Sequence, residues 1–467
     1  MTVFHVSAEC YPIAKVGGLA DVVGSLPKYQ TKLGLTSKVI MPFYNNTFTQ
    51  QHEFKTLYSD TLWMGYAIDY RILTLEDNSL GYELYLVDIP HLLFKDYVYS
   101  SNDTDRFLAF QIAVLDWMLQ MPAPPDVVHC HDHHTGLIPF MMSQSHKYAP
   151  MRNTPSVVTI HNAQYQGWFS HDKVGLIPEF NFYNVGLLDW NHTINPLAAA
   201  IKCAWRVTTV SPNYMEELKQ RANGLESLLQ YESGKCVGIL NGIDTSVWNP
   251  KSDDYLVKNY NLSSIVSGKK ANKDWLCEQF DLDPSLPLFV FIGRLVGEKG
   301  ADLFPYIFDV TLRNLPVSIL MLGSGDKGVE HRLEQLKPAY KGKYNTYIGY
   351  NEKLSHIMYA GADFLLMPSR VEPCGLNQMY ALKYGTVPIV NAVGGLKDTV
   401  VDIAEGGFGV RHYGLSVEQV VEAIHRALYF YNDTDNFKKN RKAIMQIDHS
   451  WDASAEAYNT LYSSLKK

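Results

Sequence analysis

The sequence lacks the features that mark secreted and membrane-bound proteins. Its six cysteines are scattered and form no C-x-x-C pair, so neither a zinc site nor a disulfide scaffold is indicated, and a reducing compartment is favoured. No apolar run approaches the roughly 20 residues that cross a bilayer. The first residues enter a strand-like pattern without a targeting leader. These absences predict a soluble, cytoplasmic protein.

The sequence also lacks an excess of positive charge. It has 41 Lys and Arg against 48 Asp and Glu, a formal net charge of −7. A chain of this charge has no basic field to hold nucleic acid or an anionic membrane. A few local cations can still bind a small anion, so a charged metabolite stays among the candidate ligands.

What the sequence does have is enough apolar material for two hydrophobic cores. Its 467 residues are 46% hydrophobic, and single cores stop growing at roughly 250–300 residues. Short β-branched runs alternate with amphipathic stretches, a rhythm typical of doubly wound α/β folds with parallel sheets. The first series of predicted strands is Thr2–Ala8, Lys38–Pro42, Asp126–His129, Val157–Ile160 and Arg206–Val210. The second is Leu288–Ile292, Val317–Leu322, Thr346–Ile348, Phe364–Met367 and Val387–Val390, with helices over Ser355–Gly361 and Gly375–Lys383.

The two series are separated near residue 240. Gly238–Pro250 is followed by a polar stretch that we predict to be irregular up to about Pro287. The predicted domains are therefore residues 1–240 and 241–467, both Rossmann-like, with a final helix around Asp452–Leu465 that can pack on either domain, including back on the first. Tandem domains of this kind face each other across a deep cleft at the carboxyl ends of their sheets, where such folds bind ligands.

The first motif is the loop Glu9–Asp21, which leaves a predicted strand and enters a helix. Gly17 and Gly18 stand at the start of that helix, where amides and the positive end of the helix dipole attract phosphate. Lys15 adds a mobile positive charge. An ordinary turn with a surface lysine explains a bare K-x-G-G equally well, so these residues alone leave both interpretations open.

The second motif, Gly293–Gly300, directly follows the predicted strand Leu288–Ile292. Arg294 and Lys299 can converge there on a diphosphate. A guanidinium and an ammonium together neutralise the leaving group of a nucleoside-diphosphate sugar electrostatically. Taken alone, the pair is also compatible with a solvated surface loop.

The third motif, Pro368–Gln378, follows another buried strand and leads into a helix from about Gly375. Glu372 can accept hydrogen bonds from sugar hydroxyls. The amides of Gly375 and Leu376 can donate to phosphate. The plainer interpretation is a helix cap beside a buried loop carboxylate.

Histidines cluster in the fourth motif, over His129–Gly136 and Thr159–Trp168. Such clustering suggests a metal, but only His129 and His131 share a strand face, and no carboxylate spacing completes a known site. We therefore predict no metal here. The candidate sugar-binding residues of these segments are Asp132, His161 and Asn162.

Two other patterns match signatures of different proteins. Gly323–Gly328 spells G-x-G-x-x-G, as in dinucleotide-binding dehydrogenases, but no acidic ribose ligand ends the next strand, Thr346–Ile348. We interpret it as a tight turn between a strand and a helix. The D-x-D pairs at Asp103 and Asp433 match a metal–nucleotide motif, yet neither ends a buried strand, so we interpret both as solvated turns.

Taken together, the motifs resemble a known family. The segments K-x-G-G-L, H-D-x-H-x-G-L, H-N-x-x-Y-Q-G, N-G-I-D-x-x-x-W-N-P, G-R-L-x-x-x-K-G, E-P-C-G-L-x-Q and V-G-G-L-x-D-T-V occur in this order. The chain thereby resembles bacterial glycogen synthase and plant starch synthase, retaining glucosyltransferases of the GT-B fold, from about residue 3 to 465. Each motif is weak alone, but all seven in order are highly specific.

The resemblance implies a role for each matching residue. Groups that would hold the diphosphate are Lys15, Gly17, Gly18, Arg294, Lys299 and the amides of Gly375 and Leu376. Groups that would hold the glucose are Asp132, His161, Asn162 and Glu372. Tyr350 would stack on the base, and Cys374 would line the pocket without acting as a nucleophile. The implied catalytic set is His161, Glu372, Arg294 and Lys299.

A few positions depart from the family pattern. His133 stands where tryptophan is usual, Ala163 and Gln164 replace more typical residues, and Asn377 stands where threonine is common. These departures concern the acceptor side and fine substrate contacts. The phosphate-binding motifs are intact.

The resemblance implies an enzyme that transfers glucose from ADP-glucose, or less favourably UDP-glucose, to the non-reducing end of an α-1,4-glucan with retention. It implies no metal and no organic cofactor, and domain closure on the donor is expected. The alternative is an inactive glucan-binding or regulatory protein of the same fold. Joint retention of Lys15, His161, Arg294, Lys299 and Glu372 argues against that alternative. Oligomeric state is left open.

Overall fold

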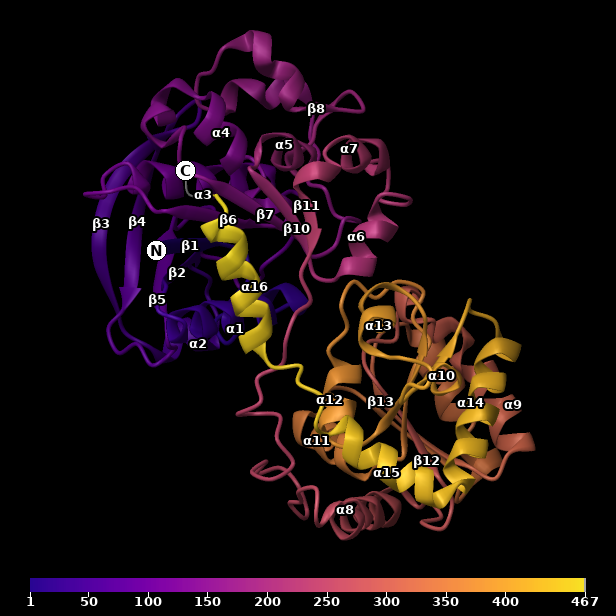
Figure 1. The fold of residues 1–467 in the computed structure, drawn as a ribbon. Helices are drawn as coiled ribbons and strands as arrows, with labels where there is room; N and C mark the ends of the chain where they lie inside the picture. The colour runs from indigo at the N-terminus through magenta and orange to yellow at the C-terminus, as the bar shows by residue number, and fades with distance from the viewer. Residues whose placement is uncertain (466–467) are drawn as a thin grey trace. The chain divides into compact units, whose positions relative to one another are not determined.

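The computed structural model describes residues 1–465, so the last two residues of the second predicted domain lie outside it. The chain forms two compact units (Figure 1). One contains Met1–Asn241 together with the chain from Trp451 onward, and the other is Gly242–Ser450. The polypeptide therefore passes from one unit to the other twice, after Asn241 and after Ser450.

The first unit is built on a nine-stranded sheet with the order β11-β10-β7-β6-β1-β2-β5-β4-β3. Its strands are β1 Thr2–Val6, β2 Thr36–Pro42, β3 Phe54–Trp63, β4 Ala67–Leu75, β5 Glu83–Asp88, β6 Val127–His131, β7 Ser156–Ile160, β10 Arg206–Thr209 and β11 Cys236–Gly238. A separate small ladder joins β8 (Asp189–Trp190) to β9 (Thr193–Ile194). Helices are α1 Gly18–Lys32, α2 Thr47–Gln51, α3 Thr104–Met118, α4 Ile138–Gln144, α5 Pro196–Cys203, α6 Pro212–Leu218, α7 Glu226–Tyr231 and α16 Trp451–Ser463.

The parallel strands of this sheet run in the order of a doubly wound fold, with β1 and β6 as central neighbours. Strand order reverses between these two, and ligands of such sheets bind outside the carboxyl ends at this switch point. The loop after β1 and the residues after β6 therefore meet there. The strands predicted for the first series are present.

The sequence prediction missed the antiparallel edge of this sheet. Strand β3 pairs antiparallel with β4, and β4 pairs antiparallel with β5. The reason is that β3 is exposed along most of its length, so it lacks the continuous apolar run by which buried strands are found. Alternating strands with one solvated face carry a weaker signal.

The C-terminal helix α16 belongs to the first unit (Figure 1). Its residues Trp451, Ala455, Tyr458 and Tyr462 are buried, spaced at i, i+4, i+7 and i+11 on one helix face. They share one apolar cluster with residues of α1, among them Val22, Leu26 and Tyr29.

The second unit has a six-stranded parallel sheet with the order β14-β13-β12-β15-β16-β17. Its strands are β12 Leu288–Ile292, β13 Ser318–Gly323, β14 Tyr344–Ile348, β15 Phe364–Met367, β16 Val387–Asn391 and β17 Val410–His412. The helices are α8 Ile265–Phe280, α9 Phe304–Asn314, α10 Lys327–Gln335, α11 Glu352–Gly361, α12 Asn377–Lys383, α13 Gly394–Thr399, α14 Val417–Asn432 and α15 Thr434–Ile444. This strand order is that of the Rossmann fold, with its switch point between β12 and β15.

Both faces of this sheet are covered. Along β12, Phe289 and Phe291 enter one apolar cluster with residues of α9, α10 and α14. Leu288 and Val290 enter another with residues of α8, α11 and α12. Alternate side chains of a strand point to opposite faces, so the continuous apolar run of β12 follows from burial on both sides. The prediction of two doubly wound α/β units is confirmed.

The prediction of an irregular stretch up to Pro287 was wrong, because Ile265–Phe280 forms helix α8. Its buried face includes lysines rather than a clean apolar stripe. The Nζ of Lys269 donates to the carbonyls of Ala360 at 2.9 Å and Tyr384 at 3.0 Å, and to Oγ1 of Thr386 at 2.8 Å. Ala360 lies in the last turn of α11, and Tyr384 caps α12. One lysine thus satisfies carbonyls left open at two helix ends.

We expect Lys269→Met to destabilise the second unit by about 2–3 kcal/mol, because it removes the ammonium's hydrogen bond to the Ala360 carbonyl and leaves the Tyr384 carbonyl with the Tyr260 hydroxyl alone. Urea denaturation followed by circular dichroism measures the loss. Lys270→Met is the matched control, because the Lys270 side chain is 72% exposed, and it should change stability by less than about 0.5 kcal/mol. Equal effects of the two substitutions would contradict this role of Lys269.

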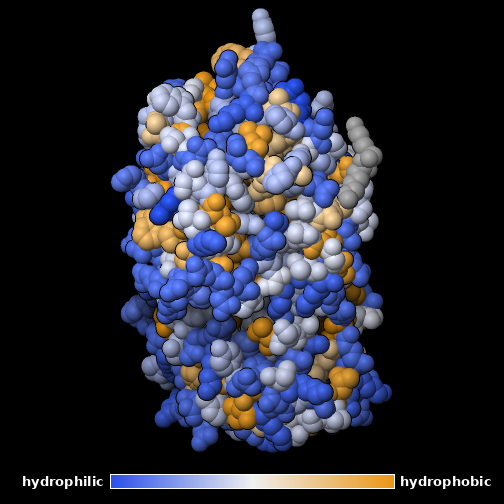
Figure 2. All heavy atoms as spheres, turned by 90° about the vertical axis from the view of Figure 1, so that its left-hand side faces the viewer, coloured by the Kyte–Doolittle hydropathy of each residue, from blue (hydrophilic) through white to orange (hydrophobic). Residues whose placement is uncertain are grey.

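Among residues 1–465, no helix is long and apolar enough to cross a bilayer. The face drawn in Figure 2 is mainly hydrophilic, with apolar side chains scattered over it.

Candidate functional site

The loop that leaves β1 is held by a residue that sequence reasoning passed over. Oε2 of Glu9 accepts hydrogen bonds from the amides of Val16 at 2.6 Å and Gly17 at 2.9 Å. The hydroxyl of Tyr99 donates to the other carboxylate oxygen at 2.5 Å. Glu9 therefore fixes the path of the chain into α1. Its place directly after a buried strand and before the glycines was the available signal.

The glycines at the start of α1 have open space around them. A Cβ added at Gly17 or Gly18 would meet no atom within 4 Å, so packing within the protein does not demand glycine there. The Gly17 amide was predicted to be available for phosphate, but it donates to Glu9 instead. The amides of Gly18 and Leu19 have no acceptor among the described residues. Glycine at both positions leaves room for a ligand to approach these amides closely.

Lys15 lies beside this helix start, and its side chain is 47% exposed. Its Nζ donates to Oδ1 of Asp21, in the first turn of α1, at 2.7 Å. An exposed ion pair of this kind is weak, so an anion at the helix start can draw the ammonium away from Asp21.

Asp132 follows β6 with a φ of 57°, a region that costs energy for residues with a side chain. Its Oδ1 accepts from the amide of His161 at 2.7 Å. Burial raises the pKa of Asp132 to about 7, although the amides of His161 and Asn162 oppose the shift. Asp132 thus ties the end of β6 to the end of β7 and positions His161.

We expect Asp132→Asn to become more stabilising as pH rises. The folded pKa lies above the unfolded value of 3.8, so the folded protein holds the proton more tightly, and this contribution is lost as pH rises through about 7. Asparagine tolerates positive φ and can still accept from the His161 amide. The stability difference between Asn and Asp should grow by about 2–3 kcal/mol from pH 5 to pH 8, measured by urea denaturation. An equal difference at both values would contradict the assignment.

His161 and Asn162 lie at the carboxyl end of β7, next to Asp132. His161 is 8% exposed, and burial lowers its pKa to about 3, so its imidazole is neutral. Nε2 of His161 lies 3.0 Å from Nδ1 of His131. The side chain of Asn162 accepts from the amide of Gln164 at 2.9 Å, which closes an Asx turn.

The predicted absence of a metal stays a prediction, because three buried histidines do lie together. Ligand atoms of His5, His129 and His131 fall within 4.8 Å of one another. Both ring nitrogens of each already have hydrogen-bond partners in the described chain. His133, which stands where the family usually has tryptophan, packs against Gly167. A Cβ added at Gly167 would lie 2.3 Å from the His133 ring.

In the second unit, Arg294 and Lys299 follow β12 at the switch point. Arg294 is exposed and makes no hydrogen bond or ion pair with any described residue. Nζ of Lys299 lies 2.5 Å from Oε2 of Glu372, which also accepts from Oγ of Ser369 at 2.9 Å. The second and third sequence motifs are therefore brought together, with Lys299 paired to a carboxylate and Arg294 without a partner among the described residues.

The segment Glu372–Leu376 rests on a pair of glycines. A Cβ at Gly394 would lie 2.1 Å from the Glu372 carbonyl oxygen, and one at Gly395 would lie 2.1 Å from that of Cys374. Gly375 has a φ of 73°, so the helix cannot begin there as predicted, and α12 begins at Asn377. No side chain caps this helix start, which leaves its first amides for a ligand.

The remaining predicted positions are distributed as follows. Tyr350 is 84% exposed in the loop after β14. Cys374 forms no disulfide within the described chain and is 5% exposed. Asn377 donates to the carbonyl of Ile292 at 2.7 Å, so this departure from the family pattern joins the start of α12 to the end of β12.

The two competing signatures are structural. Gly323 and Gly325 pack against the loop after β12, with added Cβ atoms 2.0 Å from the Gly293 carbonyl oxygen and 2.3 Å from that of Leu295, which confirms the tight turn. Asp103 and Asp433 stand at the N-cap positions of helices α3 and α15, and the exposed side chain of Asp433 accepts from the amide of Asn436.

The tryptophan of the N-G-I-D-x-x-x-W-N-P motif is also structural. The ring of Trp248 stacks between His356 at 3.8 Å and Tyr380 at 3.7 Å. It thereby anchors the start of the second unit to helices α11 and α12.

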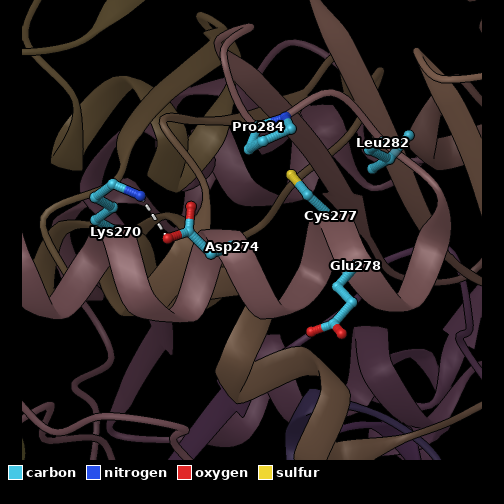
Figure 3. Close-up of a pocket in the computed structure, with 6 residues that line it drawn as sticks. All are labelled: Lys270, Asp274, Cys277, Glu278, Leu282 and Pro284. Carbon is cyan, nitrogen blue, oxygen red and sulfur yellow. Dashed lines mark hydrogen bonds and ion pairs between the residues drawn. The ribbon is translucent and has the colours of Figure 1, made fainter.

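Surface hollows along α8 lie near the amino ends of the strands of the second sheet. Figure 3 shows one, with Cys277 and Glu278 on α8 and the ion pair of Lys270 with Asp274 at 2.5 Å. A neighbouring hollow includes Asp363, which precedes β15. Amino ends of strands are not where doubly wound sheets bind ligands, so the carboxyl-end motifs are the better candidates.

Comparisons with known proteins agree with this choice. Residues 2–231 match the family described as starch synthase catalytic domain, and residues 272–443 match glycosyl transferases group 1. Glycogen synthase of Flavobacterium johnsoniae is 49% identical over 99% of both chains. That of Anoxybacillus flavithermus is 36% identical over 100% of this chain and 98% of its own.

Solved structures give the same result. The catalytic domain of starch synthase IV from Arabidopsis thaliana, bound to ADP and acarbose, superposes with a TM-score of 0.89 at 31% identity over 99% of both chains. Sucrose-phosphate synthase from Thermosynechococcus elongatus, at 17% identity and a TM-score of 0.64, over 99% of this chain and 98% of its own, shares the fold. The predicted GT-B fold class is confirmed.

Proposed function

This chain belongs to the glycogen and starch synthase family of glycosyltransferases, and we propose that it transfers glucose from ADP-glucose to the non-reducing end of an α-1,4-glucan with retention of the anomeric configuration. The observation that carries the proposal lies at the switch point of the second unit. Arg294, which has no partner among the described residues, occurs there together with the ion pair of Lys299 and Glu372. The choice of ADP is supported by the Arabidopsis relative, which binds ADP. No comparison supports an inactive glucan-binding protein.

Arg294 and Lys299 would bind the diphosphate of the donor. As the bond to glucose breaks, negative charge grows on the departing phosphate. Fixed cations and helix-start amides stabilise that charge without reorganising. The amides of Gly375 and Leu376 and the helix dipole of α12 would add to the same task, with Cys374 lining the pocket and Tyr350 stacking on the base.

In the first unit, Lys15 and the helix start at Gly17 and Gly18 would bind phosphate. Lys15 is free to exchange its exposed partner Asp21 for a phosphate, because the two opposite charges form only a weak surface pair. His161 and Asn162 would bind the glucose, and Asp132 would hold them in place through the His161 amide.

Glu372 would orient the glucose rather than attack it. Retention requires either a covalent intermediate or departure and attack on the same face of the sugar. Oε2 of Glu372 already accepts from the Lys299 ammonium and the Ser369 hydroxyl, and the pair with Lys299 balances the charge of the carboxylate, which weakens it as a nucleophile. The acceptor hydroxyl would therefore enter on the face that the diphosphate leaves.

Arg294, Lys299 and amides supply the positive charge that a metal supplies elsewhere, so we infer that no metal and no organic cofactor take part. The cytoplasm is the proposed location, because none of the six cysteines forms a disulfide in the described chain, as in a reducing compartment.

The proposal is tested by nucleoside diphosphate release with glycogen as acceptor. ADP-glucose should give release that depends on glycogen and survives EDTA, with UDP-glucose slower. Release from neither donor would contradict the proposal. Activity lost with EDTA and restored by a divalent ion would place a metal in the mechanism.

A further inference from the structure

The side chain of His161 is the end of a buried chain of hydrogen bonds. Its Nε2 lies 3.0 Å from Nδ1 of His131, and Nε2 of His131 lies 3.0 Å from Nδ1 of His5. Nε2 of His5 lies 2.8 Å from Oε1 of Gln30, on α1. Two imidazoles, from the neighbouring strands β6 and β1, thus connect His161 to a single side-chain amide.

A second branch continues from the other end of that amide. Nε2 of Gln30 donates to the hydroxyl of Tyr462, on α16, at 3.2 Å. This hydroxyl lies 2.6 Å from Nδ1 of His129, whose Nε2 lies 2.6 Å from Oγ1 of Thr159. Oγ1 of Thr159 lies 2.6 Å from Oγ1 of Thr208, which donates to the carbonyl of Val158 at 3.5 Å.

The carbonyl at the end of this second branch sets the direction of every bond in it. A carbonyl can only accept, and each hydroxyl has one proton. Thr208 therefore accepts from Thr159, Thr159 accepts from His129, and His129 accepts at Nδ1 from Tyr462. The hydroxyl of Tyr462, having given its proton, must accept from the amide nitrogen of Gln30.

The oxygen of Gln30 then faces His5, and the first branch follows. Each neutral imidazole donates at one nitrogen and accepts at the other. His5 donates to Gln30, His131 donates to His5, and His161 donates to His131, all from Nε2. Reversing the amide of Gln30 reverses both branches and loses the last bond, to Val158, so the stated direction is preferred.

The histidines of this hydrogen-bonded chain are neutral, so each ring has one donor and one acceptor nitrogen. His5, His129 and His131 are fully buried. Burial lowers the pKa of His5 to about 4, and lowers those of His129 and His131 further below their ordinary range. No described carboxylate hydrogen-bonds to any ring of the chain.

We propose that Gln30 and Tyr462 are positioning residues that set the tautomer of His161, so that its Nδ1 is an unprotonated hydrogen-bond acceptor. Within residues 1–465, Nδ1 of His161 has no partner, and it is the atom left for a sugar hydroxyl. The assignment to the sugar rests on the proposed function, whereas the tautomer is a property of the protein alone. The C-terminal helix thereby takes part in preparing the active site.

A metal ion bound by His5, His129 and His131 is the competing explanation of this cluster. It would take nitrogen lone pairs that the hydrogen bonds already use, and no carboxylate is present to complete the shell. Metal analysis of the purified protein separates the two. A stoichiometric, tightly held ion would overturn the hydrogen-bonded chain.

The direct test is ¹⁵N NMR of the protein labelled at histidine, without substrate. Protonated and unprotonated ring nitrogens have well-separated resonances, and His161 is assigned by its loss in His161→Asn. The wild type should show protonated Nε2 and unprotonated Nδ1 at His161. A protonated Nδ1 would overturn the proposal, whatever the outcome of the activity assay for the proposed function.

Variants test the role of the distant residues. Tyr462→Phe removes the acceptor of the Gln30 amide nitrogen and cuts the second branch, which leaves only Oγ of Ser37, at 2.8 Å from Oε1 of Gln30, to orient that amide. His161 should then show a mixture of both tautomers, and kcat should fall about three- to tenfold. Gln30→Glu keeps an acceptor toward His5 and should retain the single tautomer of His161. Tyr458→Phe is the matched control on α16. The ring of Tyr458 packs against His129 with 5.4 Å between ring centroids, but its hydroxyl is not one of the groups in the hydrogen-bonded chain. This variant should keep the single tautomer of His161 and the kcat of the wild type.

Two further outcomes would contradict the proposal. An unchanged His161 tautomer in Tyr462→Phe would show that Tyr462 does not set it. A mixed tautomer with unchanged kcat would show that the tautomer does not matter for transfer.

Discussion

Replacing Arg294 by alanine should lower kcat about 100- to 1000-fold while leaving the stability of the protein unchanged. The loss is expected because a fixed cation opposite charge that grows in the transition state contributes that much. Stability should not change because Arg294 is exposed and has no partner in the described chain. Initial rates at saturating ADP-glucose, together with urea denaturation, measure both quantities.

Lys299→Ala should lose as much activity, but it also removes the partner of the buried Glu372, which costs stability. Arg294→Ala is for that reason the cleaner variant. The control is Arg313→Ala, an exposed arginine of α9 paired with Asp309. Activity within about threefold of wild type in either Arg294→Ala or Lys299→Ala would remove that residue from the diphosphate site.

The second large effect is expected at Glu372. Glutamine can still accept a hydrogen bond from a glucose hydroxyl and from Ser369, so Glu372→Gln should lose only about tenfold in kcat. Alanine keeps none of these bonds and leaves Lys299 without its partner, so Glu372→Ala should lose about 1000-fold. Steady-state kinetics on the two purified variants give the ratio.

The opposite pattern would identify Glu372 as a nucleophile. In that case the glutamine variant would be as inactive as the alanine variant. Mass spectrometry of wild type mixed rapidly with donor would then also trap a glucosyl ester on Glu372. Either result would replace attack on one face by double displacement.

Strands buried on both faces were the most predictable part of the fold. Leu288–Ile292 and Phe364–Met367 were predicted with the same bounds that β12 and β15 have. Parallel strands covered by helices read as unbroken apolar runs, and the motifs at their carboxyl ends could be placed once the strands were known. Both switch-point loops follow from this signal.

Elements whose burial depends on distant partners could not be predicted in this way. Helix α8 buries Lys269 because carbonyls of α11 and α12 accept hydrogen bonds from its ammonium. The sequence around Lys269 does not show that these carbonyls lie nearby. The link from Tyr462 to His161 likewise depends on a contact between segments far apart in the sequence, because Gln30 and Tyr462 lie near opposite ends of it.

The most direct test of the account is the product formed from a single defined acceptor. A maltooligosaccharide incubated with the protein and ADP-glucose, in the presence of EDTA, should be extended at its non-reducing end by one or more glucose units, followed by ¹H NMR of the new linkage. Retaining transfer from ADP-glucose to the glucan should give an α-1,4 linkage from the first turnover onward, with one ADP released per glucose added. A β linkage would contradict retention, and ADP release without extension would contradict transfer to a glucan.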